Sequence, residues 1–428
     1  MKPFAPPFRK SVVRMLGFAF LASLLTPPAF GAGVTVRFVG AEGVRGWMQP
    51  ATEEWAKNTG NKVEYVGQPV NISATLPLYQ QYWAAKSTYV DVCMIDGVWL
   101  GIVAPHAVDL KKYFKEDEIR QHFQRIIENN TLDGKLVGIP FITDAGLLYC
   151  RTDLLPKYGY KAPPKTWEEL AEMAKKIQDG ERQAGKPDFH GFVFEGKASE
   201  SVTCNAIEWI YSYGGGTIID PDGKVTVNNP NAIKALDTAR SWIGSIAPQD
   251  VVTYGEEEAR NIWQSGGAAF MRNWTYAYAL GADSDSPISG KFDVTVLPKG
   301  GENGNNADCL GGWNLMVSEY SRNPEVAADL VRYLCSPEAQ KRRTMDWSLL
   351  PTRTVLYSDP DVLAKFPFFK TMLDVFNNAV ARPSTVTGAG YNQLSTAFSQ
   401  NVNKVLTGAE SGKEAVVQVE GVAKSIVH

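Results

Sequence analysis

The sequence predicts an α/β fold built around a parallel sheet, in a chain that forms more than one domain. The first support is the order of segments over residues 34–96, where strand-like and helix-like stretches alternate. Such a β-α-β-α-β order gives a parallel sheet with right-handed crossovers. The second support is the length of 428 residues, which exceeds the size at which one hydrophobic core stops growing. We therefore expect two or three domains.

The composition is that of a globular protein without a nucleic-acid partner. Hydrophobic residues make up 44% of the chain and charged residues 21%, which are ordinary values for globular proteins. The net charge of −3 offers no basic surface, so nucleic acid is not an expected ligand. The 11 Trp and 17 Tyr supply rings that either fill cores or stack on flat ligands.

Residues 1–32 are predicted to be a cleaved signal peptide. A basic stretch precedes an apolar run of 11 residues from Met15 to Leu25, and Ala29-Phe30-Gly31 has the spacing of small residues that signal peptidase cleaves. The run is too short to span a bilayer, and no Cys follows it closely, which argues against a lipid anchor. The mature protein is therefore expected outside the cytoplasm.

Cysteine and histidine usage predicts no metal site and no cofactor. The chain has four His, and its five Cys form no CxxC pair, which argues against zinc. The odd number of Cys leaves at least one free thiol in a monomer. Cys93 and Cys150 lie in apolar runs and are expected to be buried thiols. Cys204 and Cys309 are candidates for a bridge that spacing alone cannot establish.

The first hundred mature residues place two acids at one edge of the predicted sheet. The expected strands are 34–39, 62–66 and 89–95, and the expected helices are 47–58 and 76–85. Glu42 follows the first strand and Asp96 ends the third. Ligands of parallel sheets bind at the carboxyl ends of strands. Two acids at the same edge are stronger evidence for a site than either acid alone.

The stretch from Pro140 to Arg151 is predicted to be extended, with strand character at Leu147-Leu148-Tyr149. Thr143-Asp144 forms a polar island inside it. Burying a carboxylate is costly unless it finds hydrogen-bond donors. Asp144 is therefore either a satisfied structural acid or a ligand group, and this stretch alone leaves both interpretations open.

The rest of the chain continues as α/β and ends mostly helical. A capping box at Thr166-Trp167-Glu168-Glu169 opens a helix. Further elements are predicted as helices at 203–211, 230–243 and 256–264, strands at 189–194, 268–271, 292–297 and 309–317, helices opening at 323 and 336, and a largely helical tail over 360–428 broken at Arg382-Pro383-Ser384.

These segments resemble bacterial extracellular solute-binding proteins of ABC sugar importers, and they are most similar to trehalose/maltose and related α-glucoside binders. The resemblance covers nearly the whole mature chain. It is carried by residues 50–55, 140–149, 166–170, 266–270, 311–313 and 336–340. It implies the type II periplasmic binding protein fold, in which ligand binds between two α/β lobes joined by hinge crossovers. The expected lobes are residues 33–142 with 300–351, and residues 143–299 with 352–428.

The same resemblance assigns roles in ligand binding. Carboxylates of Glu42, Asp96 and Asp144 would accept hydrogen bonds from sugar hydroxyls. Arg382 would donate a fork to vicinal hydroxyls, or else serve a structural salt bridge. Trp274, Tyr276 and Trp313 would stack on pyranose rings, and Gly311 and Gly312 would allow a close approach to the backbone. By contrast, Trp55, Trp167 and Trp209 lie on helices and are expected in the core.

Some residues depart from the family's pattern. Thr143 stands where a ring would make a better platform, and Cys150 stands where an aromatic or aliphatic residue is expected. The resemblance assigns no position in the site to three further polar candidates, Gln68, Asn71 and Arg353. The ligand's identity therefore stays open, with glycosyl-glycerols and anionic sugars included.

The predicted function is that of a substrate-binding protein that captures a sugar and delivers it, as a monomer, to the membrane permease subunits of an ABC importer. It is not expected to be an enzyme. The alternative of a secreted glycoside hydrolase would pair acids such as Glu42 and Asp144 at about 5–10 Å. A polyamine binder would have no use for Arg382, and a phosphodiester binder would want a glycine-rich or basic helix entrance, which the sequence lacks.

Overall fold

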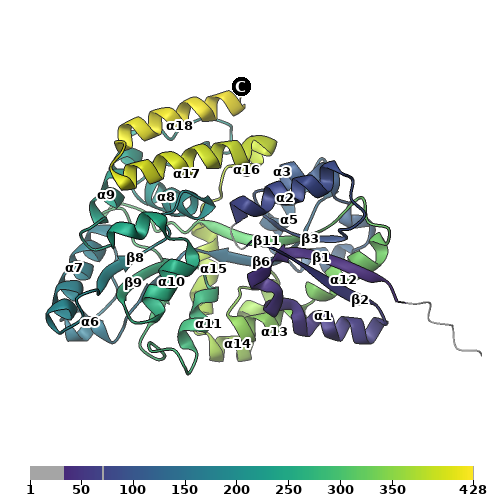
Figure 1. The fold of residues 1–428 in the computed structure, drawn as a ribbon, viewed down its shortest axis with the longest axis horizontal. Coiled ribbons are helices and arrows are strands. Elements are labelled where there is room, and N and C mark those ends of the chain that lie inside the picture. The colour runs from purple at the N-terminus through teal and green to yellow at the C-terminus, as the bar shows by residue number, and fades with distance from the viewer. Residues whose placement is uncertain (1–32, 70–71, 428) are drawn as a thin grey trace, which may run out of the picture.

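The computed structural model describes residues 33–69 and 72–427, which form two α/β lobes with a sheet in each (Figure 1). The predicted signal peptide and Asn71 lie outside the described residues. No helix in the described ranges has the length and apolar character needed to cross a membrane.

The N-terminal lobe contains a five-stranded sheet in the order β2-β1-β3-β11-β6. Its strands are β1 (Thr35–Ala41), β2 (Lys62–Gln68), β3 (Val92–Asp96), β6 (Ile139–Ala145) and β11 (Leu310–Val317). The first three run parallel, as predicted, whereas β11 runs antiparallel to both β3 and β6. The carboxyl ends of β1, β3 and β6 therefore meet at one edge of the sheet.

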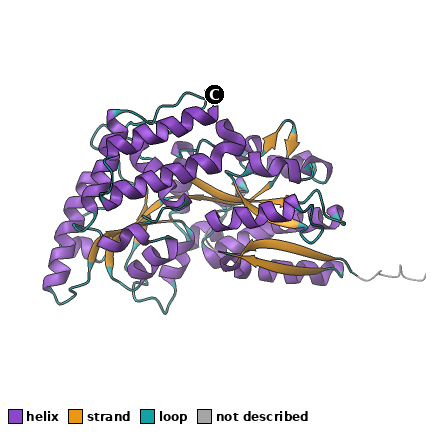
Figure 2. Cartoon of the chain, turned by 45° about the horizontal axis from the view of Figure 1, so that its top comes forward, coloured by secondary structure: helices purple, strands orange, loops and turns teal. Residues whose placement is uncertain are grey.

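Helices cover both faces of this sheet (Figure 2). They are α1 (Arg45–Thr59), α2 (Ile72–Ala84), α3 (Leu100–Val103), α12 (Pro324–Leu334) and α13 (Pro337–Trp347). Helix α1 buries Met48, Ala51 and Trp55, spaced for one helical face. It ends at Gly60, whose positive φ of 73° suits glycine. Trp55 is a core residue, as expected, and its indole N–H donates to Asp329 at 2.9 Å.

The C-terminal lobe contains a four-stranded sheet in the order β10-β7-β9-β8. Its strands are β7 (Leu147–Cys150), β8 (His190–Val193), β9 (Ala268–Asn273) and β10 (Asp293–Thr295). Its helices include α7 (Trp167–Gln183), α8 (Glu200–Ser212), α9 (Pro230–Trp242), α10 (Glu256–Gln264), α11 (Tyr276–Ala282), α17 (Tyr391–Thr407) and α18 (Gly412–Val427). The Thr166 hydroxyl caps α7 by accepting the Glu169 N–H at 3.1 Å, as the capping box predicted. Trp167 and Trp209 are fully buried in this core, also as expected.

Further helices and one hairpin complete the two lobes. They are α4 (Glu116–Arg120), α5 (Gln124–Asn129), α6 (Leu154–Lys157), α14 (Pro360–Lys365), α15 (Phe369–Asn378), α16 (Ser384–Thr387) and the hairpin of β4 (Thr131–Leu132) with β5 (Lys135–Leu136). Neither α4 nor α5 was predicted, because a helix of fewer than two turns is too short to show a hydrophobic period. All five Cys are buried and free, which includes Cys93 and Cys150 as expected.

The chain passes between the lobes at three places. Strand β6 continues to Ala145, so the boundary expected at residues 142 and 143 lies inside a strand of the N-terminal sheet. The second passage lies at Cys309, later than the expected boundary at 299 and 300, because Leu297 and Ala307 still pack in the core of the C-terminal lobe. The third lies between Leu349 and Leu350, which pack in different cores.

Candidate ligand-binding site

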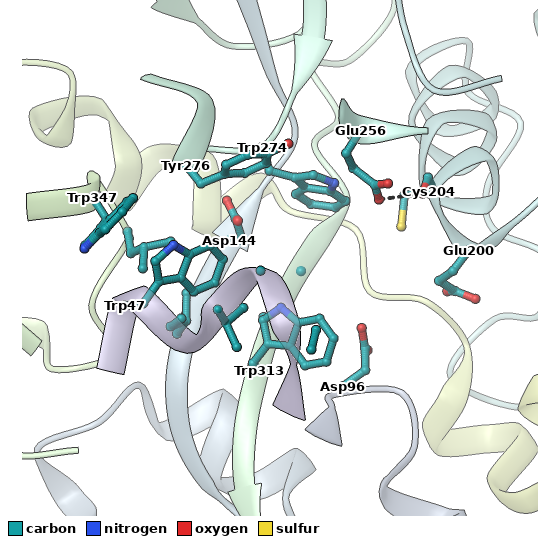
Figure 3. Close-up of a pocket in the computed structure, with 18 of the residues that line it drawn as sticks. Trp47, Asp96, Asp144, Glu200, Cys204, Glu256, Trp274, Tyr276, Trp313 and Trp347 are labelled. Carbon is teal, nitrogen blue, oxygen red and sulfur yellow. Dashed lines mark hydrogen bonds between the residues drawn. The ribbon is translucent and has the colours of Figure 1, made fainter. Parts of the chain in front are cut away.

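A cavity of about 350 Å³ lies between the two lobes (Figure 3). The carboxyl ends of β3 and β6 and the start of β11 form one wall, and the end of β9 with the starts of α8, α10 and α11 forms the other. Eight of the predicted site residues line it, namely Asp96, Asp144, Trp274, Tyr276, Gly311, Gly312, Trp313 and Arg382. The structure thus gathers residues that are up to 286 positions apart in the chain.

Glu42 is the predicted site residue that the structure does not bring into the cavity wall. Its neighbours Ala41, Gly43 and Val44 line the cavity. The Glu42 carboxylate instead pairs with Arg45 at 2.8 Å, on an exposed surface beside β2. An arginine three positions later on the same helical turn is a near neighbour, and it holds the carboxylate away from the cleft. The Glu42–Asp144 pair that a hydrolase would need is therefore not assembled in this structure.

The other polar candidates without an assigned place also lie outside the cavity. The Gln68 amide donates to the carbonyl of Gly67, and the side chain is buried. Arg353 is buried and donates to the carbonyls of Cys335 and Glu118. Both residues therefore have structural partners in place of a ligand.

Aromatic rings from both lobes face one another across the cavity (Figure 3). Trp313 projects from β11 and meets Trp99 edge-on, with ring centroids 6.4 Å apart. Trp274 follows β9, and Tyr276 begins α11 and donates its hydroxyl to Glu257 at 2.5 Å. Flat rings on opposite walls are suited to the apolar faces of a flat ligand.

The two glycines ahead of Trp313 permit close packing at the cavity wall. A Cβ on Gly311 would approach the Trp274 ring to 2.8 Å. Gly312 has φ of 138°, and a Cβ there would lie 2.6 Å from the carbonyl oxygen of Ile142. The group that approaches the Gly311 backbone is thus the Trp274 indole itself.

Sequence reasoning missed part of the cavity wall. Trp47 from α1 and Trp347 from α13 extend the aromatic lining, and Trp47 lies 6.5 Å from Tyr276 between centroids. Glu200 and Glu256 supply further carboxylates from the starts of α8 and α10. The rule that ligands bind beyond the carboxyl ends of strands would not have found Glu200, because the first acid after β8 is Glu195, which is buried and does not line the cavity.

One end of the cavity holds a buried cluster of three charges. Arg382 donates to Asp96 at 3.0 Å and to Glu200 at 2.8 Å. Asp96 belongs to the N-terminal lobe and Glu200 to the C-terminal lobe, so Arg382 links the two. Asp96 also accepts the Val98 N–H at 2.9 Å. Burial raises the pKa of Asp96, and the nearby Arg382 opposes that rise. Arg382 therefore lines the cavity and forms the structural salt bridge that was the alternative role for it, while donation to a ligand stays a prediction.

Asp144 lies at the centre of the cavity, between the aromatic rings (Figure 3). Its Oδ1 atom accepts the Thr275 hydroxyl at 2.9 Å and the N–H groups of Thr275 at 3.2 Å and Ala145 at 2.9 Å. Burial raises its pKa to about 6, although these hydrogen bonds favour the charged form. Asp144 thus ties the end of β6 to the start of α11, and the side chain is still partly exposed to the cavity.

The remaining acids of the wall have protein partners. Glu256 accepts the Ser201 hydroxyl at 2.5 Å, and Glu257 accepts Arg260 as well as Tyr276. Within the described residues, no group of three or more His, Cys, Asp and Glu side chains is placed to hold a metal ion. The cavity wall thus presents rings, carboxylates and one guanidinium, together with Ser201 and Cys204.

Comparisons with known proteins agree with this architecture. The family model described as bacterial extracellular solute-binding protein matches residues 40–341. A Deinococcus radiodurans protein named as a probable ABC transporter-binding protein is 55% identical over 369 residues, which are 86% of this chain and 87% of the relative.

Solved structures show the same fold. Maltose-bound MalE3 of T. maritima superposes with a TM-score of 0.86 at 35% identity, over 92% of this chain and 100% of that chain. A solute-binding protein of Agrobacterium radiobacter K84, solved with ribitol, has a TM-score of 0.80 at 24% identity, over 92% and 98% of the two chains. The relatives are named as binding proteins, which agrees with the class predicted from the sequence. The chain belongs to the family of bacterial extracellular solute-binding proteins, with the type II two-lobe fold.

Proposed function

We propose that this protein captures a small saccharide between its lobes and delivers it to the membrane permease subunits of an ABC importer in the periplasm. The expected ligand is a disaccharide, an α-glucoside or a related glycoside, and the protein is expected to act as a monomer. The observation that carries the proposal is the pairing of aromatic rings from both lobes around carboxylates and a guanidinium.

The chemistry of the cavity fits a saccharide in two ways. Trp274, Tyr276 and Trp313 present apolar faces, and C–H groups of a pyranose ring pack against such faces. Between the rings, Asp144 and Asp96 offer carboxylate oxygens, which make the stronger, charge-assisted class of hydrogen bond with hydroxyls. A cavity of about 350 Å³ lies in the range of small-molecule sites. The likeness to a maltose-bound structure at 35% identity supports the same ligand class.

Calorimetry with the mature protein tests the proposal. Maltose, trehalose, ribitol and an unrelated amino acid would be titrated, with melting curves recorded on the same samples. A saccharide that binds only the folded protein raises the melting temperature in proportion to the logarithm of its concentration over Kd. Chromatography of the ligand after long incubation should return it intact. The absence of binding to every saccharide, or cleavage of the ligand, would contradict the proposal.

Asp144→Asn should weaken saccharide binding by about 1.5–3 kcal/mol, the usual worth of a hydrogen bond to a charged group. The amide oxygen can keep the bonds from Thr275 and Ala145, and the amide carries no charge that burial penalises. At pH 7 the unliganded variant should therefore melt no lower than the wild type. The measurement is calorimetric titration together with a melting curve. Asp144→Ala is the matched variant that loses those bonds, and it should melt lower. Wild-type affinity in Asp144→Asn would remove Asp144 from the ligand contacts.

The pH dependence of binding should follow Asp144. Its folded pKa of about 6 lies above the ordinary value, so the carboxylate is charged above that pH and loses its charge below it. Saccharide hydroxyls favour the charged form, hence wild-type affinity should fall as pH decreases from 7 toward 5. The same group should destabilise the unliganded protein as pH rises from about 4 through 6, because the folded state holds the proton more tightly. The pH dependence of affinity and that of stability should both be absent from Asp144→Asn, as measured by titrations and melting curves on the two proteins. If the variant keeps the pH dependence of the wild type, another group is responsible.

A further inference from the structure

Arg272 lies in β9, two residues before Trp274, and is completely buried. Its Nε donates to Glu208 at 2.9 Å, its Nη2 contacts the other oxygen of the same carboxylate, and its Nη1 lies 3.4 Å from Glu195. Glu195 and Glu208 are also completely buried. Buried ion pairs repay their desolvation poorly, so stability alone is a weak reason for this cluster.

The guanidinium of Arg272 packs on the Trp274 ring. Its Cζ atom lies 4.1 Å from the ring centroid, which is a stacked cation–π contact. Trp274 also lines the cavity, and its ring lies over the Gly311 backbone. The protein therefore holds the indole between a guanidinium that two carboxylates keep in place and a strand that has no side chain at the point of contact.

The same ion pair contacts both of the first two passages between the lobes. Glu208 Oε1 accepts the N–H of Cys309 at 3.0 Å, directly before β11. At the first passage, Gly146 lies so close that any Cβ would collide with the Glu208 carboxylate and the Arg272 guanidinium. The ring, the ion pair and the two passages therefore form one contiguous set of contacts.

We infer that Arg272, held by Glu208, is a positioning residue for ligand binding: it sets the plane of the Trp274 ring and fixes that ring relative to the first two passages between the lobes. The inference rests on the proposed function, because the ring's orientation matters only if Trp274 stacks on the ligand. It predicts that Arg272 affects affinity through Trp274, although its own side chain does not line the cavity.

The substitution Arg272→Lys tests the positioning role of Arg272 without removing the positive charge that pairs with Glu208. Lysine offers a point charge and no planar face for the indole. The probe is the saccharide that the wild type binds in the titrations proposed above. In the wild-type background the substitution should raise the Kd of this probe by about tenfold. In the Trp274→Leu background it should have little further effect, since coupled residues show such non-additivity. Calorimetry on the four proteins of this cycle gives the answer. Losses that simply add would overturn the inference.

Arg343→Lys is the matched control. Arg343 is also buried, lies 4.0 Å from the Phe141 centroid and donates to the Leu334 carbonyl at 2.8 Å, and it does not line the cavity. Its substitution should lower the melting temperature and leave Kd unchanged. An equal loss of affinity in both lysine variants would show a general effect of softening the core and would overturn the inference.

A measurement without ligand separates this inference from the proposed function. The near-UV circular dichroism of wild type minus Trp274→Leu isolates the signal of that indole. The same difference is then taken in the lysine background, as the spectrum of Arg272→Lys minus the spectrum of the double variant with Trp274→Leu. This second band should differ visibly from the first, because the ring is no longer held against a guanidinium. An unchanged band overturns the positioning role, whether or not any saccharide binds. A changed band with no saccharide bound by the wild type would contradict the proposed function alone.

Discussion

Arg382→Met should destabilise the unliganded protein by about 3–5 kcal/mol at pH 7, the usual cost of breaking a buried ion pair by removing one partner. The substitution leaves Asp96 and Glu200 facing one another in a buried place without the cation that lies 3.0 and 2.8 Å from them. Asp96 belongs to the N-terminal lobe and Glu200 to the C-terminal lobe, so the loss of Arg382 should also weaken the contact between the lobes. Chemical denaturation followed by circular dichroism measures the effect.

The pH dependence of this destabilisation identifies its cause. Without Arg382 the folded-state pKa of Asp96 should rise further, because burial is no longer opposed by a positive charge. Protonation at pH 5 then relieves the unpaired charge, and the difference from wild type should shrink as pH falls from 7 to 5. A difference that is constant over this range would mean that lost packing, and not charge, is responsible.

Lys341→Met is a matched control for this substitution. Lys341 also lies between two carboxylates, at 2.9 Å from Asp359 and 2.7 Å from Asp361, but on the surface. Exposed pairs are worth about 0–1 kcal/mol, so this variant should remain near wild type in stability. Comparable losses in the two variants would contradict the view that Arg382 acts through burial.

The sequence was informative where local patterns decide the structure. Alternating strands and helices over residues 34–96 predict the parallel part of the first sheet, and the same order predicts Asp96 at its carboxyl edge. The predictions fail where a partner distant in sequence, or a competing neighbour, decides the outcome. Glu42 satisfies the same rule as Asp96, but Arg45 captures its carboxylate. A rule based on strand ends cannot weigh that competition.

Trp47 and Trp347 show the second limit. Helical periodicity places Trp47 on a face of α1, but it does not tell which face meets the other lobe, because that depends on how the two sheets are joined. The second passage departs from its expected position for a related reason. Residues 298–308 are rich in Gly and Asn, as an exposed loop is, yet Ala307 packs into the C-terminal core, which no local signal reveals.

Trp313→Ala should weaken saccharide binding by about 1–3 kcal/mol, the value of burying a large apolar side chain. The ring lines the cavity from β11 and is half-buried in the absence of ligand, so a stacked sugar would bury the surface that remains. A cost in stability is also expected, because the ring meets Trp99 edge-on at 6.4 Å, and such pairs contribute about 0.5–1.5 kcal/mol beyond their area. Calorimetry and denaturation of one preparation measure both effects.

Trp83→Leu is the control that separates an effect on saccharide affinity from an effect on stability. Trp83 is buried in the same lobe, stacks on His106 with centroids 5.3 Å apart and does not line the cavity. Its substitution should lower stability without changing affinity, whereas Trp313→Ala should lower affinity by more than stability. Trp313→Phe, which restores a smaller ring, should recover part of the affinity, since stacking needs an aromatic face. Binding by Trp313→Ala that equals wild type would show that the ring belongs to the N-terminal core and that the ligand stacks elsewhere in the cavity.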